Sequence, residues 1–157
     1  MLIGFLFWVL TAIIPEPKYE CTPTTAAIRK IQPSDRVISD EEIFRIAHYI
    51  DRAANETGIN PDPLVVMTYG ETRFDPSIVN IMQISQTWYA NPKAPTYCHL
   101  ARKSQEASIR CGAFVLSECN RKFRKEENKY LCWSGFHIED KEGYLERIED
   151  RWNLIRD

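Results

Sequence analysis

The chain has 157 residues, of which 44% are hydrophobic and 27% are charged, and its formal net charge at pH 7 is −2. This length and apolar content are enough to bury one adequate core, so we expect one compact domain rather than two. The near-neutral balance of charge argues against a nucleic-acid binder, for which a strongly basic face would be expected.

The N-terminal 14 residues form a separate apolar segment, interrupted only by Gly4 and Thr11. At about 1.5 Å per residue this segment is too short to cross a hydrocarbon core of roughly 30 Å without its flanks. Residues 1–14 are predicted to be a signal peptide or a short membrane anchor. The choice stays open, because no Lys or Arg precedes the run and no Ala-x-Ala cleavage site follows it. Four prolines then predict an extended linker over residues 15–38, and they disfavour a buried strand or helix in the N-terminal segment.

The predicted folded domain spans residues 39–157 and begins with an amphipathic helix. Ser39 and Glu42 have the spacing of a capping box, and Gly58 is a stop signal. The apolar residues between them recur at helical spacing: Ile43, Ile46, Ala47, Ile50, Ala53 and Ala54. His48 lies off this stripe and is predicted to be a surface or groove residue.

A second helix is predicted to end on one carboxylate, Glu71. We expect Asp62 to cap this helix and the sequence 74–76 to stop it. Residues 64–69 offer no polar face, which predicts a helix buried on most sides. Partial burial and the negative end of the helix dipole both raise the pKa of a carboxyl group in this place. Glu71 is therefore a candidate general acid, and an ordinary solvated residue at a helix end is the alternative.

The remainder of the chain is also predicted to be helical, which makes the fold class all-α. Residues 90–103 are predicted to form a loop, and residues 104–125 the longest helix. Gly112 and Ala113 on this helix permit the close approach of another helix. A turn at residues 126–128 is predicted to lead into a segment at 129–135, and residues 140–155 form the last amphipathic helix.

Five cysteines outside the N-terminal segment favour an oxidising compartment. Cys119 and Cys132 lie at nearly equal distances on either side of the predicted turn, so we favour a disulfide between them. A second disulfide, between Cys98 and Cys111, is then possible, and Cys21 would have no partner. A zinc site is a weak alternative because no C-x-x-C pair is present.

Five short motifs resemble, in chain order, the signatures of the lysozyme-like soluble lytic transglycosylase (SLT-type) domain. They read ETRFDP, IMQIS, ASIRCGAFVL, WSG and GYLERI, where the family shows E-S-x-F-x-P, G-L-M-Q, N-I-x-x-G-x-x-Y-L, A-Y-N-x-G and a closing tyrosine helix. The matching residues are Glu71, Thr72, Phe74, Pro76, Met82, Gln83, Ile109, Gly112, Ala113, Phe114, Leu116, Trp133, Ser134, Gly135 and Tyr144. The resemblance covers roughly residues 38–155 and implies a lysozyme-like helical fold.

The same resemblance implies cleavage of the MurNAc–GlcNAc β-1,4 bond of peptidoglycan. Glu71 would be the single catalytic residue, the product would be a 1,6-anhydro sugar, and no metal or organic cofactor would be needed. The candidate substrate-binding residues are Thr72, Met82, Gln83, Trp133, Ser134, Tyr130 and Tyr144. The implied partners are peptidoglycan glycan strands. The implied location is exported: periplasmic, anchored in the inner membrane and facing the periplasm, or secreted. The N-terminal segment leaves membrane attachment open, and the oligomeric state is not predicted.

The sequence departs from the family pattern in two places. Only residues 77–81 separate the first two motifs, about six residues fewer than the family has. Trp133 and Ser134 stand where the family has Tyr-Asn, so the indole keeps a flat ring but offers an N–H instead of a hydroxyl. Tyr130 and Tyr144 are the remaining candidates for a hydroxyl contact to Glu71, and Tyr144 matches the family position better.

Other roles remain open at this stage. The second carboxylate that most glycosidases need is not evident, because Asp75 is expected to shape the turn beside Pro76. Trp88 and Tyr89 are core residues or stacking platforms for sugars. The alternative functions are a lysozyme-like muramidase that hydrolyses the same bond, and a non-catalytic component that binds the cell wall in a secretion system or phage particle.

Overall fold

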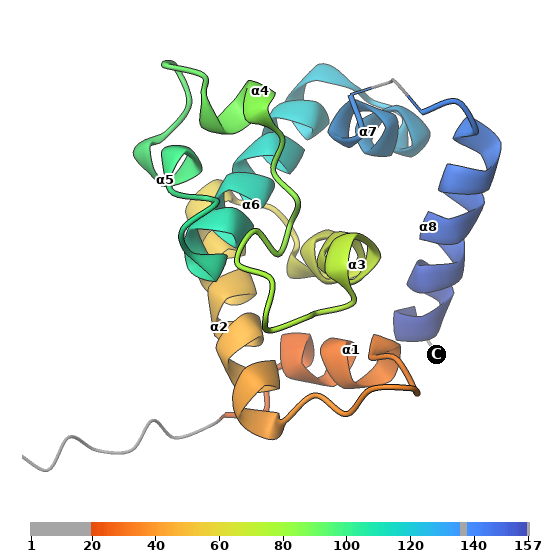
Figure 1. The fold of residues 1–157 in the computed structure, drawn as a ribbon. Helices are drawn as coiled ribbons and strands as arrows, with labels where there is room; N and C mark the ends of the chain where they lie inside the picture. The colour runs from red at the N-terminus through yellow and green to blue at the C-terminus, as the bar shows by residue number, and fades with distance from the viewer. Residues whose placement is uncertain (1–19, 136–137, 157) are drawn as a thin grey trace, which may run out of the picture.

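The computed structural model describes residues 20–135 and 138–156 (Figure 1). In these ranges the chain is helical and contains no β-strand, which confirms the all-α class for the described part. The helices are α1 (Pro23–Ile31), α2 (Asp40–Thr57), α3 (Pro61–Thr72), α4 (Gln86–Tyr89), α5 (Thr96–His99), α6 (Gln105–Lys122), α7 (Glu126–Trp133) and α8 (Lys141–Arg156).

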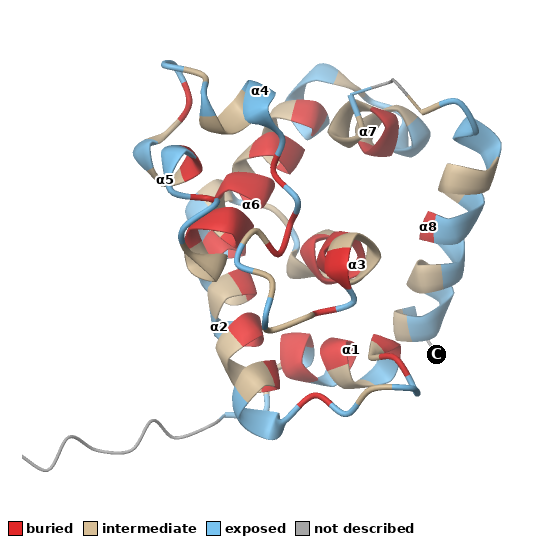
Figure 2. Cartoon of the chain, in the orientation of Figure 1, coloured by how far each residue is buried: buried red, intermediate tan, exposed pale blue. Residues whose placement is uncertain are grey.

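The α3 helix occupies the centre of the molecule. It packs against α1, α2, α6 and α8, and Figure 1 views it almost along its axis with these helices around it. Leu64, Val65 and Val66 are completely buried, and Figure 2 shows buried and intermediate residues but no exposed ones along α3. The prediction of a helix buried on most sides is confirmed. Because Glu71 is the penultimate residue of α3, it lies where the chain leaves the core.

The ends of α3 are set by local chemistry. Asn60, and not Asp62 as predicted, is the N-cap, and its side-chain oxygen accepts a 2.9 Å hydrogen bond from the Asp62 amide. Pro61 takes the first helical position, where its missing N–H removes no helical hydrogen bond. At the other end, Arg73 adopts a left-handed conformation with φ of 54° and stops the helix. Glu71 is therefore in the last turn, as predicted.

The predicted linker over residues 15–38 is wrong for its second half, because Pro23–Ile31 form α1. Thr22 caps this helix through a hydrogen bond from the Thr25 amide, and Pro23 takes the first turn, where proline is tolerated. Ile28 and Ile31 are buried against the core. This part of the chain therefore belongs to the folded domain.

The α2 helix has the predicted capping box between Ser39 and Glu42 and ends at Gly58, which has a φ of 69°. The predicted turn at residues 126–128 is instead the first turn of α7, and the break between α6 and α7 lies at residues 123–125. Glu126 and Glu127 suit the first turn of a helix because they complement the positive end of its dipole.

Two disulfides join neighbouring helices. Cys119–Cys132 links α6 to α7, as predicted, and Cys98–Cys111 links α5 to α6, so the pairing that the sequence left open is also formed. Cys21 is a free, exposed cysteine. Both bonds indicate an oxidising, exported environment.

The predicted signal peptide or anchor at residues 1–14 lies outside the described residues. Among the helices that the structure describes, none combines the length and the apolar character needed to cross a membrane.

Candidate functional site

Glu71 lies in the wall of a pocket of about 200 Å³. The described residues that line this pocket are Glu71, Gln83, Ile84, Ser85, Trp88, Val115, Trp133 and Ser134. They come from the end of α3, the loop after it, α4, α6 and α7. Among these lining residues Glu71 alone has an ionisable side chain, so acid–base chemistry in this pocket depends on one carboxyl group.

The carboxyl group of Glu71 is held by the side chain of Trp133. The indole Nε1–H donates a hydrogen bond to Glu71 Oε1 over 3.0 Å. Burial raises the pKa of Glu71 above its ordinary value, while the Trp133 hydrogen bond and the positive charge of Arg151 act in the opposite direction. The net direction is upward, as predicted from the position of Glu71 at the edge of the core.

Tyr144, on α8, approaches Glu71 but does not bind it. Its hydroxyl is buried and has no hydrogen-bond partner among the described residues. Burial, and secondly the negative charge of Glu71, raise the pKa of Tyr144. The predicted hydroxyl contact to Glu71 is therefore absent from the described structure, and the Trp133 indole takes that place.

Tyr130, on α7, is bound to Trp152 of α8 and not to Glu71. Its hydroxyl accepts a 2.7 Å hydrogen bond from Trp152 Nε1, and burial raises the pKa of Tyr130 to about 12. It is buried and does not line the pocket. Tyr130 therefore holds α7 against α8, and its predicted place among the substrate-binding residues receives no support from its position.

Thr72 and Met82 lie behind the pocket rather than in its wall. The Thr72 hydroxyl donates to the Ile81 carbonyl over 3.0 Å, which fixes the loop against α3. Met82 is completely buried, and its sulfur accepts a hydrogen bond from the hydroxyl of Thr68. Both residues therefore support the site, and direct contact between either one and a ligand in the pocket is not indicated.

Gly112 provides the space in which this packing occurs. A Cβ at Gly112 would lie 2.6 Å from Met82 Cε and 3.2 Å from Trp133 Cη2. The sequence predicts that Gly112 admits a neighbouring helix, and its closest neighbours include the Trp133 ring of α7 beside the Met82 side chain. Gly112 therefore helps to place the indole that binds Glu71.

Gln83 and Ser134 do line the pocket. Gln83 is exposed and has a φ of 49°, and its side-chain amide donates to the Asn80 carbonyl over 3.2 Å. The Ser134 hydroxyl donates to the Leu131 carbonyl over 2.8 Å. Trp88 also lines the pocket, and its ring meets Phe114 edge-on at 6.0 Å. These residues surround Glu71 with polar groups and one aromatic surface.

The short loop after α3 is held by a buried hydrogen-bond network. Asn80 accepts hydrogen bonds at its side-chain oxygen from the Ile84 amide and from the Ser108 hydroxyl, each 2.9 Å long. Ser108 accepts in turn from the Met82 amide over 3.0 Å. Gln105 donates to two loop carbonyls, each over 3.0 Å. The loop is therefore well supported despite its length.

The carboxylates of Asp75 and Glu56 lie outside this pocket. Asp75 pairs with Arg36 at 3.0 Å and accepts hydrogen bonds from Ser77, which hold the pKa of Asp75 below its ordinary value. Asp75 thus shapes the turn, as predicted. Glu56 pairs with Arg52 and Arg110 on the surface.

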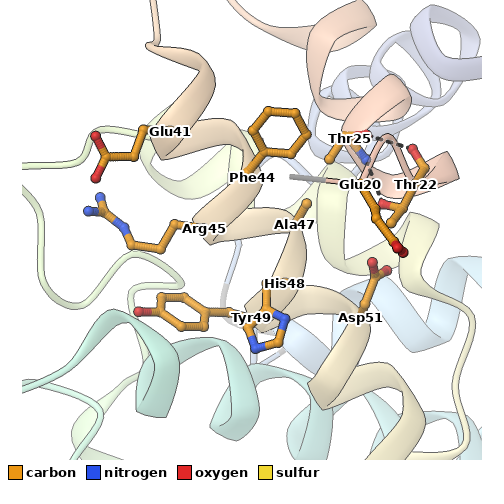
Figure 3. A pocket seen from close by; sticks show the side chains of 10 residues that line it. All are labelled: Glu20, Thr22, Thr25, Glu41, Phe44, Arg45, Ala47, His48, Tyr49 and Asp51. Atoms are coloured by element: carbon orange, nitrogen blue, oxygen red, sulfur yellow. Dashed lines mark hydrogen bonds between the residues drawn. The ribbon is translucent and has the colours of Figure 1, made fainter. Parts of the chain in front are cut away.

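A larger pocket, of about 500 Å³, lies along the outer side of α2. Its walls come from α2 and from the start of α1, and they include His48, the predicted groove residue (Figure 3). Asp51 in this wall accepts a hydrogen bond from Thr24. No group of three or more His, Cys, Asp or Glu in the described part of the chain could hold a metal ion. This pocket does not contain Glu71, and we place the candidate site at the smaller one.

Several residues of the site are not among those predicted from the sequence. Ile84 and Ser85 directly follow the predicted Met82–Gln83 pair, and Val115 lies three positions after Gly112 on α6. Arg151 affects the pKa of Glu71 from α8. Its position seven residues after Tyr144, on the same face of a helix, is the signal that could have identified it.

Comparison with known proteins gave no match: no protein-family model, no curated protein and no solved structure is significantly similar to the chain.

Proposed function

We propose that this chain is a peptidoglycan lytic transglycosylase of the lysozyme-like type. In this proposal it acts in the periplasm or another exported location on the MurNAc–GlcNAc β-1,4 bond. The observation that carries the proposal is the protonation chemistry of Glu71: one half-buried carboxyl with a raised pKa, in the wall of a pocket, held by the Trp133 indole. A carboxylic acid that stays protonated at a higher pH than usual can give its proton to a leaving oxygen.

A single carboxyl favours a substrate-assisted mechanism. Most glycosidases use two carboxylates that flank the bond, and Glu71 has no second carboxylate among the described residues of its pocket. In the proposed reaction the N-acetyl oxygen of MurNAc attacks C1 while Glu71 protonates the glycosidic oxygen, and the C1–O bond breaks. The Glu71 carboxylate then takes the proton of the C6 hydroxyl. The C6 oxygen attacks C1 and displaces the N-acetyl oxygen, which gives the 1,6-anhydro product and restores the acid.

The residues around Glu71 would have distinct parts in binding. Trp88 offers an aromatic surface on which a sugar ring can stack, and Gln83 offers both a donor and an acceptor to an acetamido group. Trp133 orients the carboxyl group.

The test is digestion of purified sacculi followed by mass analysis of the soluble products. The wild-type chain should release anhydro-muropeptides, and Glu71→Gln should release none. Glu146→Gln, which removes an exposed carboxylate of α8, is the matched control and should retain activity. Unchanged turnover by Glu71→Gln contradicts the proposal. Products heavier by one water would identify a hydrolase, and binding to sacculi without any turnover would identify a non-catalytic wall-binding protein.

A further inference from the structure

The guanidinium group of Arg151 lies directly on the backbone of α3 beside Glu71. A Cβ at Gly70 would be 2.1 Å from Arg151 Nη1 and 2.8 Å from Cζ, so only glycine leaves room for the group in its present place. Glycine inside a helix is less favourable than alanine by about 1 kcal/mol. This less favourable glycine stands immediately before Glu71, at the position where the Arg151 guanidinium packs against the helix.

Arg151 is near Glu71 without forming an ion pair with it. Among the described residues, none forms an ion pair with Arg151 or accepts a hydrogen bond from its side chain. Arg151 is partly buried, and this burial lowers the pKa of its guanidinium. The charge therefore acts on Glu71 through space, and Arg151 occupies neither carboxyl oxygen.

The groups that face Glu71 are few. Trp133 reaches it from α7, and Tyr144 and Arg151 approach from α8. Within the described residues, no titratable side chain of α1, α2 or α6 contributes to the pKa of Glu71. Arg151 is thus the one cation among these groups. Its charge lowers the pKa of Glu71, whereas burial raises it.

We propose that Arg151 is a positioning residue of this site, whose guanidinium, seated on Gly70, lets one carboxyl group act first as an acid and then as a base. This inference rests on the proposed function, because a transglycosylase asks both roles of Glu71. Burial alone would favour the neutral acid, which cannot accept the proton of the C6 hydroxyl. A direct ion pair would favour the carboxylate, which cannot protonate a leaving group. A nearby cation that forms no ion pair leaves both the neutral acid and the carboxylate of Glu71 accessible.

The test uses the titration of Glu71 followed by NMR of the chain labelled with ¹³C at glutamate carboxyl groups. Arg151→Met removes the charge, and Gly70→Ala displaces the guanidinium while leaving it in the protein. Because the atoms that must move are the flexible end of a side chain, Gly70→Ala should fold normally. Each variant should raise the pKa of Glu71, and the double variant should raise it no further than Arg151→Met does.

Arg147→Met is the matched control, since it removes a more exposed positive charge from the same helix. It should leave the titration of Glu71 unchanged, and Arg151→Lys should restore part of the wild-type value. In sacculus digestion, Arg151→Met should move the alkaline limb of the kcat/KM profile to higher pH. A Glu71 titration that is the same in Arg151→Met, Gly70→Ala and the wild type overturns the role of Arg151, even if cleavage is intact. A chain that cleaves no peptidoglycan while these titrations shift overturns the proposed function instead.

Discussion

Trp133 and Glu71, 62 positions apart in the chain, are joined by a 3.0 Å hydrogen bond from the indole Nε1–H to the carboxyl Oε1. The bond connects the end of α7 to the end of α3. It stabilises the carboxylate, whereas burial stabilises the acid, so the indole limits the rise in the pKa of Glu71. Because the indole itself is uncharged and only a donor, it orients the carboxyl group without titrating.

Replacing Trp133 by Phe should raise the pKa of Glu71 further. The Phe ring retains part of the aromatic packing against Gly112, but the donor that favours the carboxylate is lost. The measurement is the ¹³C titration of Glu71. Trp152→Phe is the control, because it removes an indole N–H that donates to Tyr130 instead. An identical Glu71 titration in both variants would show that the hydrogen bond has no effect on the carboxyl group.

Replacing Glu71 by Gln should stabilise the fold at neutral pH and not at low pH. The folded pKa of Glu71 is raised above its ordinary value of 4.5, so the folded chain binds the proton more tightly than the unfolded chain. The stability from the protonated form is fully present below the ordinary pKa and is lost as the pH rises through the folded pKa. Gln is neutral at every pH, so the Glu71→Gln chain does not lose this stability as the pH rises.

This prediction is tested by thermal unfolding of Glu71→Gln and the wild type at about pH 3 and about pH 8, on either side of the ordinary pKa of a glutamate. The difference in Tm should be larger at the higher pH. Glu146→Gln, at an exposed position, should show no such trend. A difference in Tm that does not depend on pH would mean that Glu71 titrates alike in the folded and unfolded chains.

The two disulfides should contribute similarly to stability but differently to the site. Each joins cysteines 13 positions apart, so loop-closure entropy predicts a comparable loss of about 3 kcal/mol when either is replaced by serines. Cys132 directly precedes Trp133, whereas Cys98–Cys111 holds α5. We therefore expect only the Cys119→Ser/Cys132→Ser variant to change the titration of Glu71.

Urea unfolding of both double variants measures the stability loss, and the ¹³C titration measures the effect on the site. Equal stability losses with an altered Glu71 titration in the Cys119→Ser/Cys132→Ser variant alone would support a specific role in placing the indole. If both variants alter the titration of Glu71 equally, the effect comes from a general loss of packing and not from the placement of the indole.

Local signals in the sequence account for much of the fold. The capping box at Ser39 and the glycine at Gly58 bound α2 correctly, because the groups that satisfy a helix end lie within a few residues of it. The prediction of a linker misses α1 because Pro23, inside this helix, stands among other prolines that favour an extended chain. The combination of a Thr22 cap with Pro23 in the first turn is itself a typical helix start, and the buried Ile28 shows that tertiary packing completes it.

The candidate site could be predicted only in part. Glu71 was identifiable because the apolar run before it and the stop after it are both local. The hydrogen-bond partner of Glu71 was not, because the choice between the Trp133 indole and the Tyr144 hydroxyl depends on how α7 and α8 are placed around α3. Arg151 was overlooked for the same reason, since its contact with Gly70 joins helices far apart in sequence.

The network beneath the short loop should be essential for stability. Ser108→Ala removes a hydroxyl that binds both Asn80 and the Met82 amide, and leaves buried polar groups unpaired. We expect a loss of about 1–3 kcal/mol in the free energy of unfolding, measured with urea. Ser77→Ala, which removes the hydroxyl of an exposed serine that binds Asp75, should cost less than about 0.5 kcal/mol. Equally small losses of stability in both variants would show that water binds Asn80 and the Met82 amide in place of the Ser108 hydroxyl.

Tyr144 and Tyr130 should respond differently to the loss of their hydroxyls. Tyr144→Phe removes a buried hydroxyl with no partner among the described residues, so stability should be unchanged or higher, and the Glu71 titration should not move. Tyr130→Phe leaves the Trp152 N–H without its acceptor and should cost about 1–3 kcal/mol. The free energy of unfolding and the ¹³C titration are measured on both variants. A rise in the pKa of Glu71 in Tyr144→Phe would show that the hydroxyl does bind the carboxylate in solution, and would restore the contact that the sequence resemblance predicted.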